Sequence, residues 1–430
     1  MKNNYDVIVI GAGPAGLAAA IEAKKTGAKD VLIIERNNEP GGILLQCIHN
    51  GFGSVIFKKD LPGPAYASNF IDEAKGLEIE MLFDTMVLDL TPERKIYAAN
   101  SSDGFIELYA RAVVLAMGCR ERTRAQIRIP GERPAGVYTA GMVQRLVNIE
   151  GYMPGKNFVI LGSGDIGMIM ARRLTIEGAN VIKVVELLPY LTGLRRNYVQ
   201  CLNDFNIPLE LSTTIKRIIG KKRVEAVETV KVDESLVPVA GTEKIITCDT
   251  LLLSVGLIPE NELSRKAGVA LDPLTLGPVV DEKMSTNVAG IFAAGNVVTI
   301  YDLVDYVSAA GSAAGISAAH FAAGAPEAPD TVNIIPGDGV RSVIPQKISS
   351  VYGSANPVFV ELRVSREFSE KISINITDNG NAVYSHMEKY ARPAEMITLK
   401  INWNELSKKL SKECKDLTVS VVKNNVKAEV

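Results

Sequence analysis

The sequence has few cysteines, and none of them lie close together. The five are Cys47, Cys119, Cys201, Cys248 and Cys414, and they form no C-x-x-C or C-x4-C pair. Zinc and iron–sulfur sites usually need clustered thiolates, so no metal site is expected. Reduction of a disulfide substrate needs one thiol that attacks and a second that resolves. The spacing therefore disfavours that reaction.

The sequence also lacks a strong charge imbalance. It has 47 Lys and Arg against 49 Asp and Glu, a formal net charge of −2. No global field would attract nucleic acid or anionic lipid, so small-molecule ligands are the expected partners.

Signals for export or membrane insertion are missing as well. The first residues have no cationic segment followed by a long apolar core, so we expect a cytoplasmic protein. The apolar stretch 304–325 contains Asp305 and His320, which a membrane span would have to bury. We predict a packed helix there, with His320 as a hydrogen-bonded core residue, and not an integral membrane protein.

Two segments of the 430-residue chain share one layout. The first runs from an apolar strand through GAGPAG at 11–16, a helix of small residues and a strand ending at Glu35. The second has GSGDIG at 162–167, a helix and a strand ending at Glu186. From Gly11 to Glu35 and from Gly162 to Glu186 the distance is 24 positions.

This layout is typical of dinucleotide-binding folds. The first glycine permits a tight turn, the second lets the backbone approach a pyrophosphate, and the third lets helix and strand pack closely. The helix N-terminus offers N–H groups to the phosphates, and the acid accepts hydrogen bonds from a ribose diol. A glycine turn in some other α/β domain is the disfavoured alternative.

Later apolar strands complete two such domains, which gives an α/β fold with two Rossmann-like units. We predict a discontinuous first domain over 1–120 and 259–326, with the second inserted over 121–258. Beyond residue 326, four stretches alternate apolar and polar residues with period two. They predict a small β-rich C-terminal domain over 327–430.

Over residues 5–325 the sequence resembles the FAD-dependent pyridine nucleotide-disulfide oxidoreductase superfamily. The matching motifs are GAGPAG with Glu35, EPGGI at 39–43, AMGCRER at 116–122, GSGDIG with Glu186, and GIFAAGN at 290–296. GGILLQCIHNGFG at 41–53 and RPAEM at 392–396 further resemble the FAD/NAD-binding subunits of opine oxidases, hydrogen cyanide synthase, dye-linked proline dehydrogenases and anaerobic glycerol-3-phosphate dehydrogenase systems.

The resemblance implies FAD in the first domain and NAD in the second, with NADP less favoured. The FAD contacts it implies are Gly11, Gly13, Ala15, Gly16, Glu35, Arg36, Gly42, Ile43, Gln46, Val87, Gly118, Gly295, Asn296 and Val304. The NAD contacts it implies are Gly162, Gly164, Asp165, Ile166, Glu186 and Gly256. At position 296 the family usually has Asp, and here Asn takes its place.

Selection of the nicotinamide cofactor depends on two opposing features. The Glu186 carboxylate would repel the 2′-phosphate of NADP, which favours NAD. Arg195 and Arg196 follow within ten residues and could reach a phosphate.

Cys47 is the one candidate catalytic thiol, because it lies in the loop expected beside the flavin. A thiolate there could support a self-sufficient NADH oxidase or peroxidase. The alternative is a thiol that is only packed, as free cysteines commonly are.

The main prediction is an FAD-dependent oxidoreductase that passes hydride or electrons between NAD(H) and a partner dehydrogenase or small acceptor. A non-enzymatic FAD-containing scaffold is the third possibility. The β-rich tail would act as a lid, form the surface of a homo-oligomer, or bind a partner subunit.

Overall fold

The computed structural model describes residues 2–325, 331–349 and 357–423. It divides into two compact units, the first comprising 1–45, 50–119 and 259–430, and the second 46–49 and 120–258. The expected boundary between residues 326 and 327 lies outside the described residues. The predicted α/β class, with parallel sheets and a strand-rich C-terminal region, is confirmed.

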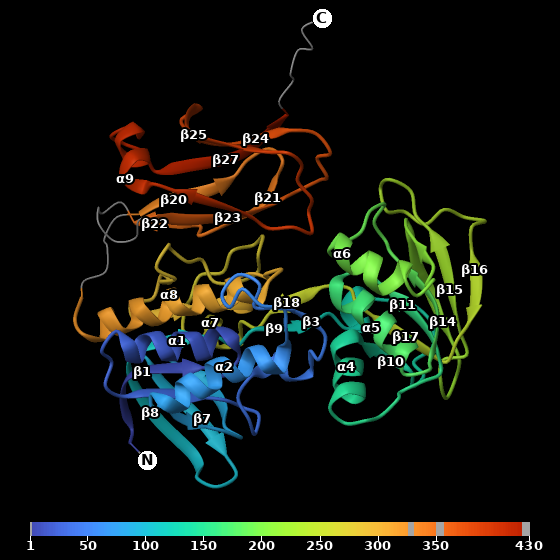
Figure 1. Ribbon diagram of the computed structural model, residues 1–430, viewed down its shortest axis with the longest axis horizontal. Helices are drawn as coiled ribbons and strands as arrows, with labels where there is room; N and C mark the ends of the chain where they lie inside the picture. Colours follow the sequence, from blue (N-terminus) through green and yellow to red (C-terminus); the bar gives the residue numbers. More distant parts are fainter. Residues whose placement is uncertain (1, 326–330, 350–356, 424–430) are drawn as a thin grey trace, which may run out of the picture. The chain divides into compact units, whose positions relative to one another are not determined.

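The first unit is built on a seven-stranded sheet (Figure 1). β1 (Asn4–Ile10) lies between β2 (Val31–Ile34) and β8 (Gly104–Leu115) and is parallel to both. β19 (Ile291–Ala293) runs parallel to β8 on its other side. The central stretches of these strands, 7–10, 31–34, 112–115 and 291–293, are continuous apolar runs because both faces of the parallel part are buried. The remaining strands are β5 (Glu80–Leu82), β6 (Met86–Leu90) and β7 (Lys95–Asn100).

Two helices rich in small residues, α1 (Pro14–Lys25) and α8 (Val304–Ala322), pack together against this sheet. A Cβ atom added at Gly311 would lie 2.2 Å from the Ala15 carbonyl oxygen, and one at Gly315 would lie 2.0 Å from that of Ala19. Backbone therefore meets backbone at both positions. The connecting elements of this unit are η1 (Gly42–Gln46), β3 (Asn50–Phe52), β4 (Leu61–Pro62), α2 (Gly63–Gly76), α7 (Glu262–Lys266) and η3 (Gly295–Val297).

The expectation for His320 was wrong. Its side chain is exposed, because the buried face of α8 consists of small residues such as Ala314 and Ala318, and position 320 falls on the other face.

The C-terminal strands of the first unit form two sheets with their own apolar core between them. In Figure 1 they are the orange-red and red strands near the C-terminal end of the chain. Apolar and polar residues alternate along β23 and β24, as predicted for half-buried strands. The elements are β20 (Thr331–Pro336), β21 (Val340–Ile344), β22 (Lys347–Ser349), β23 (Val358–Val364), β24 (Ile372–Asp378), β25 (Asn381–Glu388), β26 (Ile397–Ile401), α9 (Trp403–Leu406), η4 (Ser407–Lys409) and β27 (Asp416–Lys423).

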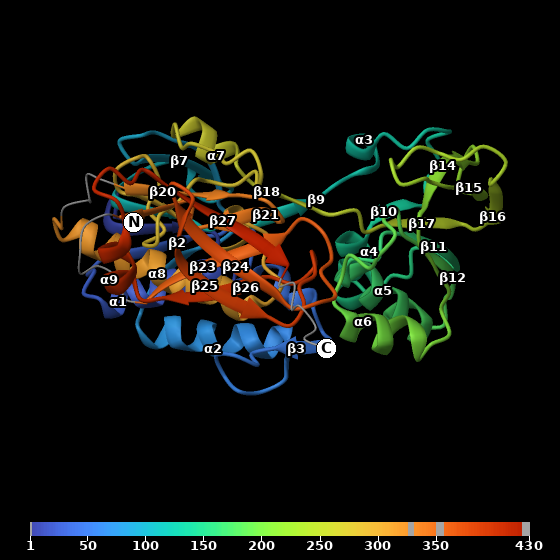
Figure 2. The same cartoon turned by 90° about the horizontal axis from the view of Figure 1, so that it is seen from above.

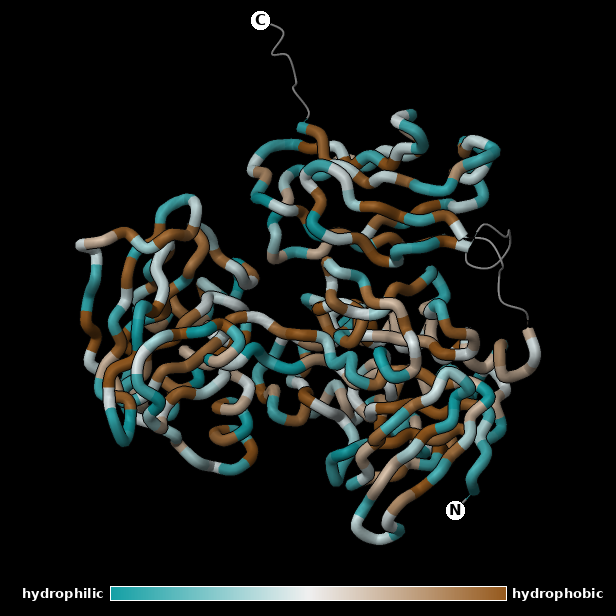
Figure 3. The backbone as a smooth tube through the Cα atoms, turned by 180° about the vertical axis from the view of Figure 1, so that it is seen from behind, coloured by the Kyte–Doolittle hydropathy of each residue, from teal (hydrophilic) through white to brown (hydrophobic). Residues whose placement is uncertain are grey.

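The second unit contains a five-stranded parallel sheet in the order β10-β17-β11-β12-β13 and a three-stranded antiparallel sheet (Figure 2). Its parallel strands are β10 (Val137–Thr139), β11 (Asn157–Leu161), β12 (Asn180–Val185), β13 (Leu209–Glu210) and β17 (Thr250–Leu253). Its helices are α3 (Arg124–Ile127), α4 (Ala140–Asn148), α5 (Asp165–Ile176), α6 (Arg195–Tyr198) and η2 (Val199–Asn203). The antiparallel strands are β14 (Thr213–Ile219), β15 (Ala226–Lys231) and β16 (Lys244–Thr247), and β9 (Cys119–Glu121) and β18 (Leu257–Pro259) carry the chain between the units. Hydrophobic stretches, coloured brown, occur in both units (Figure 3).

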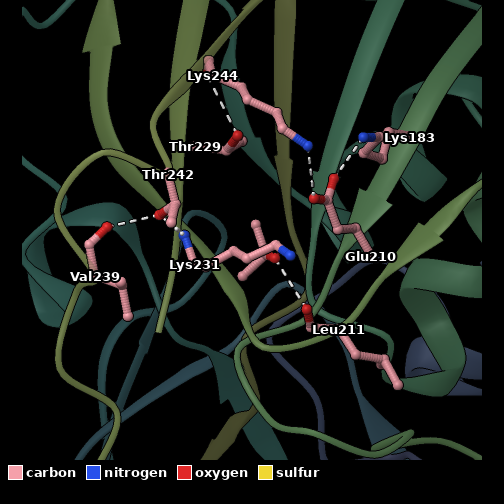
Figure 4. Close-up of polar contacts among 9 residues, drawn as sticks. Lys183, Glu210, Leu211, Thr229, Lys231, Val239, Thr242 and Lys244 are labelled. Atoms are coloured by element: carbon pink, nitrogen blue, oxygen red, sulfur yellow. Dashed lines mark hydrogen bonds and ion pairs between the residues drawn. The ribbon is translucent and has the colours of Figure 1, made fainter. Parts of the chain in front are cut away.

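An ion-pair group joins the two sheets of the second unit (Figure 4). Glu210 on the edge strand β13 accepts from Lys183 of β12 at 2.5 Å and from Lys244 of β16 at 3.4 Å. These lysines, Lys183 first, lower the pKa of Glu210.

The α1–α8 contact makes Gly311→Ala a test of the packing. Overpacking typically costs about 1 to 3 kcal/mol, more than the intrinsic helix gain of alanine over glycine. We expect the melting temperature of the protein to fall by several degrees, measured by circular dichroism. Gly76→Ala in α2, where an added Cβ meets no atom within 4 Å, is the control and should not lower it. Equal melting temperatures for the two variants would contradict the tight contact.

Candidate functional site

The first glycine loop connects β1 to α1 and requires glycine for two different reasons. Gly11 has φ of 107°, and a Cβ there would lie 2.5 Å from the Ala116 carbonyl oxygen. A Cβ at Gly16 would lie 1.8 Å from the Gly11 carbonyl oxygen, so only glycine lets α1 approach β1 this closely. These residues place the start of the helix at the end of the strand.

The space beside the start of α1 is open. A Cβ at Gly13 would meet no heavy atom within 4 Å. No side chain caps this helix, and its first turn contains no acid. The first N–H groups of α1 therefore suit an anion such as a pyrophosphate.

Glu35 lies at the end of β2 and is only 6% exposed. One of its carboxylate oxygens accepts from the Ala12 N–H at 2.8 Å, and the other accepts from the Asn37 N–H at 2.9 Å. Each oxygen has capacity for a further donor, so the carboxylate could also accept from a ribose diol.

Two distant segments converge on the same helix start. The Gly41 N–H donates to the Ala12 carbonyl at 2.8 Å, and a Cβ at Gly42 would lie 3.0 Å from the Gly13 Cα. A Cβ at Gly295 would lie 2.7 Å from the Ala15 Cβ. The cradle made by these glycines and Glu35 fits the FAD that the sequence motifs imply.

Both the oxygen and the nitrogen of the Asn296 side-chain amide form hydrogen bonds. Its oxygen accepts from the Tyr301 N–H at 3.1 Å, and its nitrogen donates to the Cys119 sulfur at 3.7 Å. A carboxylate at this position could accept from Tyr301 but has no proton to donate. The departure from the usual Asp thus has a local structural role.

The other residues expected at FAD have varied surroundings. Val87 is buried on β6, Val304 begins α8, and the Gly118 carbonyl accepts from the Glu260 N–H at 3.0 Å. Arg36 and Ile43 are exposed.

The structural role of Asp305 was not predicted from the sequence. Its buried carboxylate accepts from the backbone N–H groups of Gly53 at 3.2 Å and Ile56 at 2.8 Å, and so holds the 53–56 loop at the start of α8. An acid in the first turn of a helix was the available signal.

The second glycine loop repeats the first in the second unit. Gly162 has φ of 102°, and a Cβ there would lie 2.0 Å from the Ser254 carbonyl oxygen. Glu186, 4% exposed, accepts from the N–H of Ser163 at 2.7 Å and of Leu188 at 2.9 Å, the same pattern as at Glu35. A Cβ at Gly167 would lie 2.8 Å from the Gly162 carbonyl oxygen.

Glu186 also has two partners that Glu35 lacks. The hydroxyls of Ser163 and Thr192 donate to the same carboxylate oxygen at 2.7 and 3.0 Å, and the sequence carried no signal for either. The oxygen that accepts from Leu188 keeps capacity for another donor.

The other expected NAD contacts cluster around the start of α5. Asp165 accepts from the Leu194 N–H at 2.8 Å and the Asn197 amide at 2.6 Å, and Gly164 and Ile166 flank it. Gly256 has φ of 94°, and its carbonyl accepts from the Arg122 N–H at 3.0 Å.

Gln46 and Cys47 contact α4. The Gln46 amide donates to the Gly141 carbonyl at 2.9 Å and to the Gln144 side chain at 3.0 Å, and the Cys47 thiol donates to Gln144 at 3.7 Å. Burial raises the pKa of Cys47 to about 12. The thiol is therefore protonated at neutral pH. All five cysteines are free thiols.

Within the part of the chain that the structure describes, no three His, Cys, Asp or Glu side chains gather as a metal site would require. No helix in those same ranges is both long and apolar enough to cross a membrane.

Residues 5–323 match the family model for pyridine nucleotide-disulphide oxidoreductases. One of the subunits of opine oxidase from Agrobacterium tumefaciens is 27% identical over 69% of this chain and 62% of that protein, so the chain spans about three fifths of that relative. Thioredoxin reductase of Listeria innocua is 28% identical over 68% of this chain and 86% of that protein. The crystal structure of thioredoxin reductase from T. acidophilum has a TM-score of 0.61 at 24% identity and covers 74% of this chain and 98% of that one, which shows the shared fold. The chain therefore belongs to the pyridine nucleotide-disulphide oxidoreductase family, whose members bind FAD and carry an NAD(P)-binding domain.

Proposed function

We propose that this chain is an FAD-dependent NAD(H) oxidoreductase that passes hydride or electrons between the pyridine nucleotide and a partner dehydrogenase or a small acceptor. The observation that carries the proposal is the repeated loop, in which a buried carboxylate holds a glycine turn at a helix start in each unit. When bound, FAD supplies the redox chemistry, while the protein supplies position and electrostatics.

In this proposal the start of one helix and one carboxylate in each unit bind a dinucleotide. The start of α1 holds the FAD pyrophosphate, and Glu35 accepts from its adenosine ribose. The start of α5 and Glu186 do the same for NAD in the second unit. The FAD domain of this proposal comprises residues 1–120 and 259–326 and the NAD domain 121–258, although residues 46–49 and 120 group with the second unit.

Thiol chemistry is the weaker candidate. A peroxidase cycle or disulfide exchange needs a thiolate, and burial keeps the Cys47 thiol protonated. The likeness to thioredoxin reductases therefore supports the fold and cofactors proposed here, and not a disulfide substrate.

A partner protein is favoured by two observations. The opine oxidase relative is by its name one subunit of a larger enzyme. The described strands beyond residue 331 form a separate apolar core that lies outside the family match. We propose that this region contributes to partner docking, with a lid or a homodimer surface as the alternatives.

The isolated chain should be reduced by NADH but should not oxidise a physiological substrate. We expect anaerobic NADH to bleach the flavin absorbance, while opines, glycerol 3-phosphate and proline give turnover only after co-purification with proteins encoded beside it. An FAD-loaded chain that NADH does not bleach would support the scaffold alternative. Full substrate turnover by the chain alone would exclude the partner, and fast peroxide turnover would favour the thiol mechanism.

Glu186 should make NADH the better substrate. A buried carboxylate next to a 2′-phosphate opposes binding by about 1 to 3 kcal/mol, or roughly 5- to 150-fold. We expect kcat/KM for dye reduction to favour NADH by a ratio in this range, and Glu186→Gln to narrow that ratio.

Glu210→Gln is the matched control for the cofactor preference, because Glu210 is a paired carboxylate on the neighbouring strand. The ratio of kcat/KM with NADH to kcat/KM with NADPH should be the same in Glu210→Gln as in the unmodified protein. Equal efficiency with both cofactors in the unmodified protein would show that Arg195 or Arg196 accommodates the phosphate.

Cys47 should react slowly in the folded protein. A pKa of about 12 in place of about 9 lowers the thiolate fraction at pH 8 by roughly a thousandfold, and alkylation follows the thiolate. We expect iodoacetamide to modify Cys47 only after denaturation, measured by peptide mass spectrometry. The folded protein holds this proton above pH 9 while the unfolded chain releases it, so the thiol lowers stability as pH rises from about 9 to 12.

Cys47→Ser should retain NADH-dependent dye reduction. A loss greater than about tenfold with FAD still bound would assign the thiol a catalytic role.

A further inference from the structure

The short turn between η3 and α8 is held at one end by a nearby side chain and at the other by a side chain distant in sequence. At its start, Asn296 accepts from the Tyr301 N–H. At its end, the Arg363 guanidinium of β23 donates to the Ile300 carbonyl at 2.9 Å and pairs with the Asp302 carboxylate. The turn therefore joins the Gly295–Asn296 segment to the C-terminal strands.

Arg363 also holds a second turn. Its other terminal nitrogen donates to the carbonyls of Pro393 at 3.2 Å and Ala394 at 2.9 Å. The second oxygen of Asp302 accepts from the Met396 N–H at 2.5 Å. One planar guanidinium thus bridges two turns, a geometry that a lysine ammonium cannot reproduce.

This ion pair is mostly removed from water. The Arg363 side chain is 15% exposed and that of Asp302 is 12% exposed. Loss of one partner from such a pair leaves the other charge buried and uncompensated, which is strongly destabilising. Ion pairs on the surface contribute little to stability by comparison. Arg366 and Asp338 form such a pair nearby, with side chains 56% and 78% exposed.

The neighbouring residues are buried polar groups. Tyr301 is buried in the turn before α8, and its hydroxyl has no hydrogen-bond partner among the described residues, although Glu361 lies near enough to influence it electrostatically. Glu361 lies two residues before Arg363 and opposite Thr398 of β26. Burial raises the pKa of Glu361 to about 7. This face of β23 and β26 is therefore polar and desolvated where it meets the turn.

We propose that the C-terminal strands are energetically coupled to the FAD cradle through this turn, with Arg363 as the positioning residue. The inference rests on the proposed FAD site at Gly295 and Asn296. Because coupling is reciprocal, FAD binding should stabilise β23 and β26, and loss of Arg363 should weaken FAD binding.

The test measures FAD affinity by fluorescence titration of the apoprotein. We expect Arg363→Met to raise the dissociation constant by about 5- to 150-fold, and Arg363→Lys to give an intermediate value. Arg366→Met, on the same segment, should bind FAD like the unmodified protein. Where Arg363→Met does not fold, Asp302→Asn is the second variant, because it keeps the size of the side chain.

Hydrogen exchange supplies the reciprocal measurement. FAD should slow exchange in 358–364 and 397–401 of the unmodified protein and should not do so in Arg363→Lys to the same extent. A folded Arg363 or Asp302 variant with unchanged FAD affinity, or strands whose exchange FAD leaves unaltered, would overturn the coupling. Failure of the unmodified protein to bind FAD would instead refute the proposed function.

Discussion

Helices α1 and α8 lie so close that backbone meets backbone at Gly311 and Gly315, and this contact joins two helices that are far apart in the sequence of the first unit. α1 begins at the glycine loop, and α8 begins at Val304, eight residues after Asn296. Contact between the helices therefore sets the distance between the two segments that would enclose FAD. A larger residue at either glycine would move one segment relative to the other, because a close-packed interior cannot absorb the volume.

The two glycine loops have the same local structure. A tight turn exposes backbone N–H groups, and a carboxylate at the end of the next strand accepts from one of them in each unit. The same carboxylate accepts from the N–H two residues after itself. These two hydrogen bonds fix the carboxylate beside the loop and leave it able to accept a hydrogen bond from a ligand. The geometry is therefore preorganised for a nucleotide, but it does not indicate which third substrate the protein uses.

The region beyond residue 331 combines its own core with an ionic junction. Its two sheets bury an apolar core between them, as an independent domain would. Arg363 nevertheless places a desolvated charge against Asp302, which follows the Gly295 segment by only a few residues. An appended domain held through such a pair is sensitive to events in the cradle, whereas one held by scattered surface contacts would not be.

The sequence by itself determined the glycine loops, the acid at the end of each following strand, and the alternating strands of the C-terminal region. These features depend on neighbouring residues, because a positive φ, a strand period and a helix start are local properties. Only the tertiary structure decided that His320 is exposed, that Cys47 is buried and protonated, and that Arg363 meets Asp302. Burial and ion pairing between segments far apart in the chain leave no periodic trace, since they depend on which surfaces meet after folding.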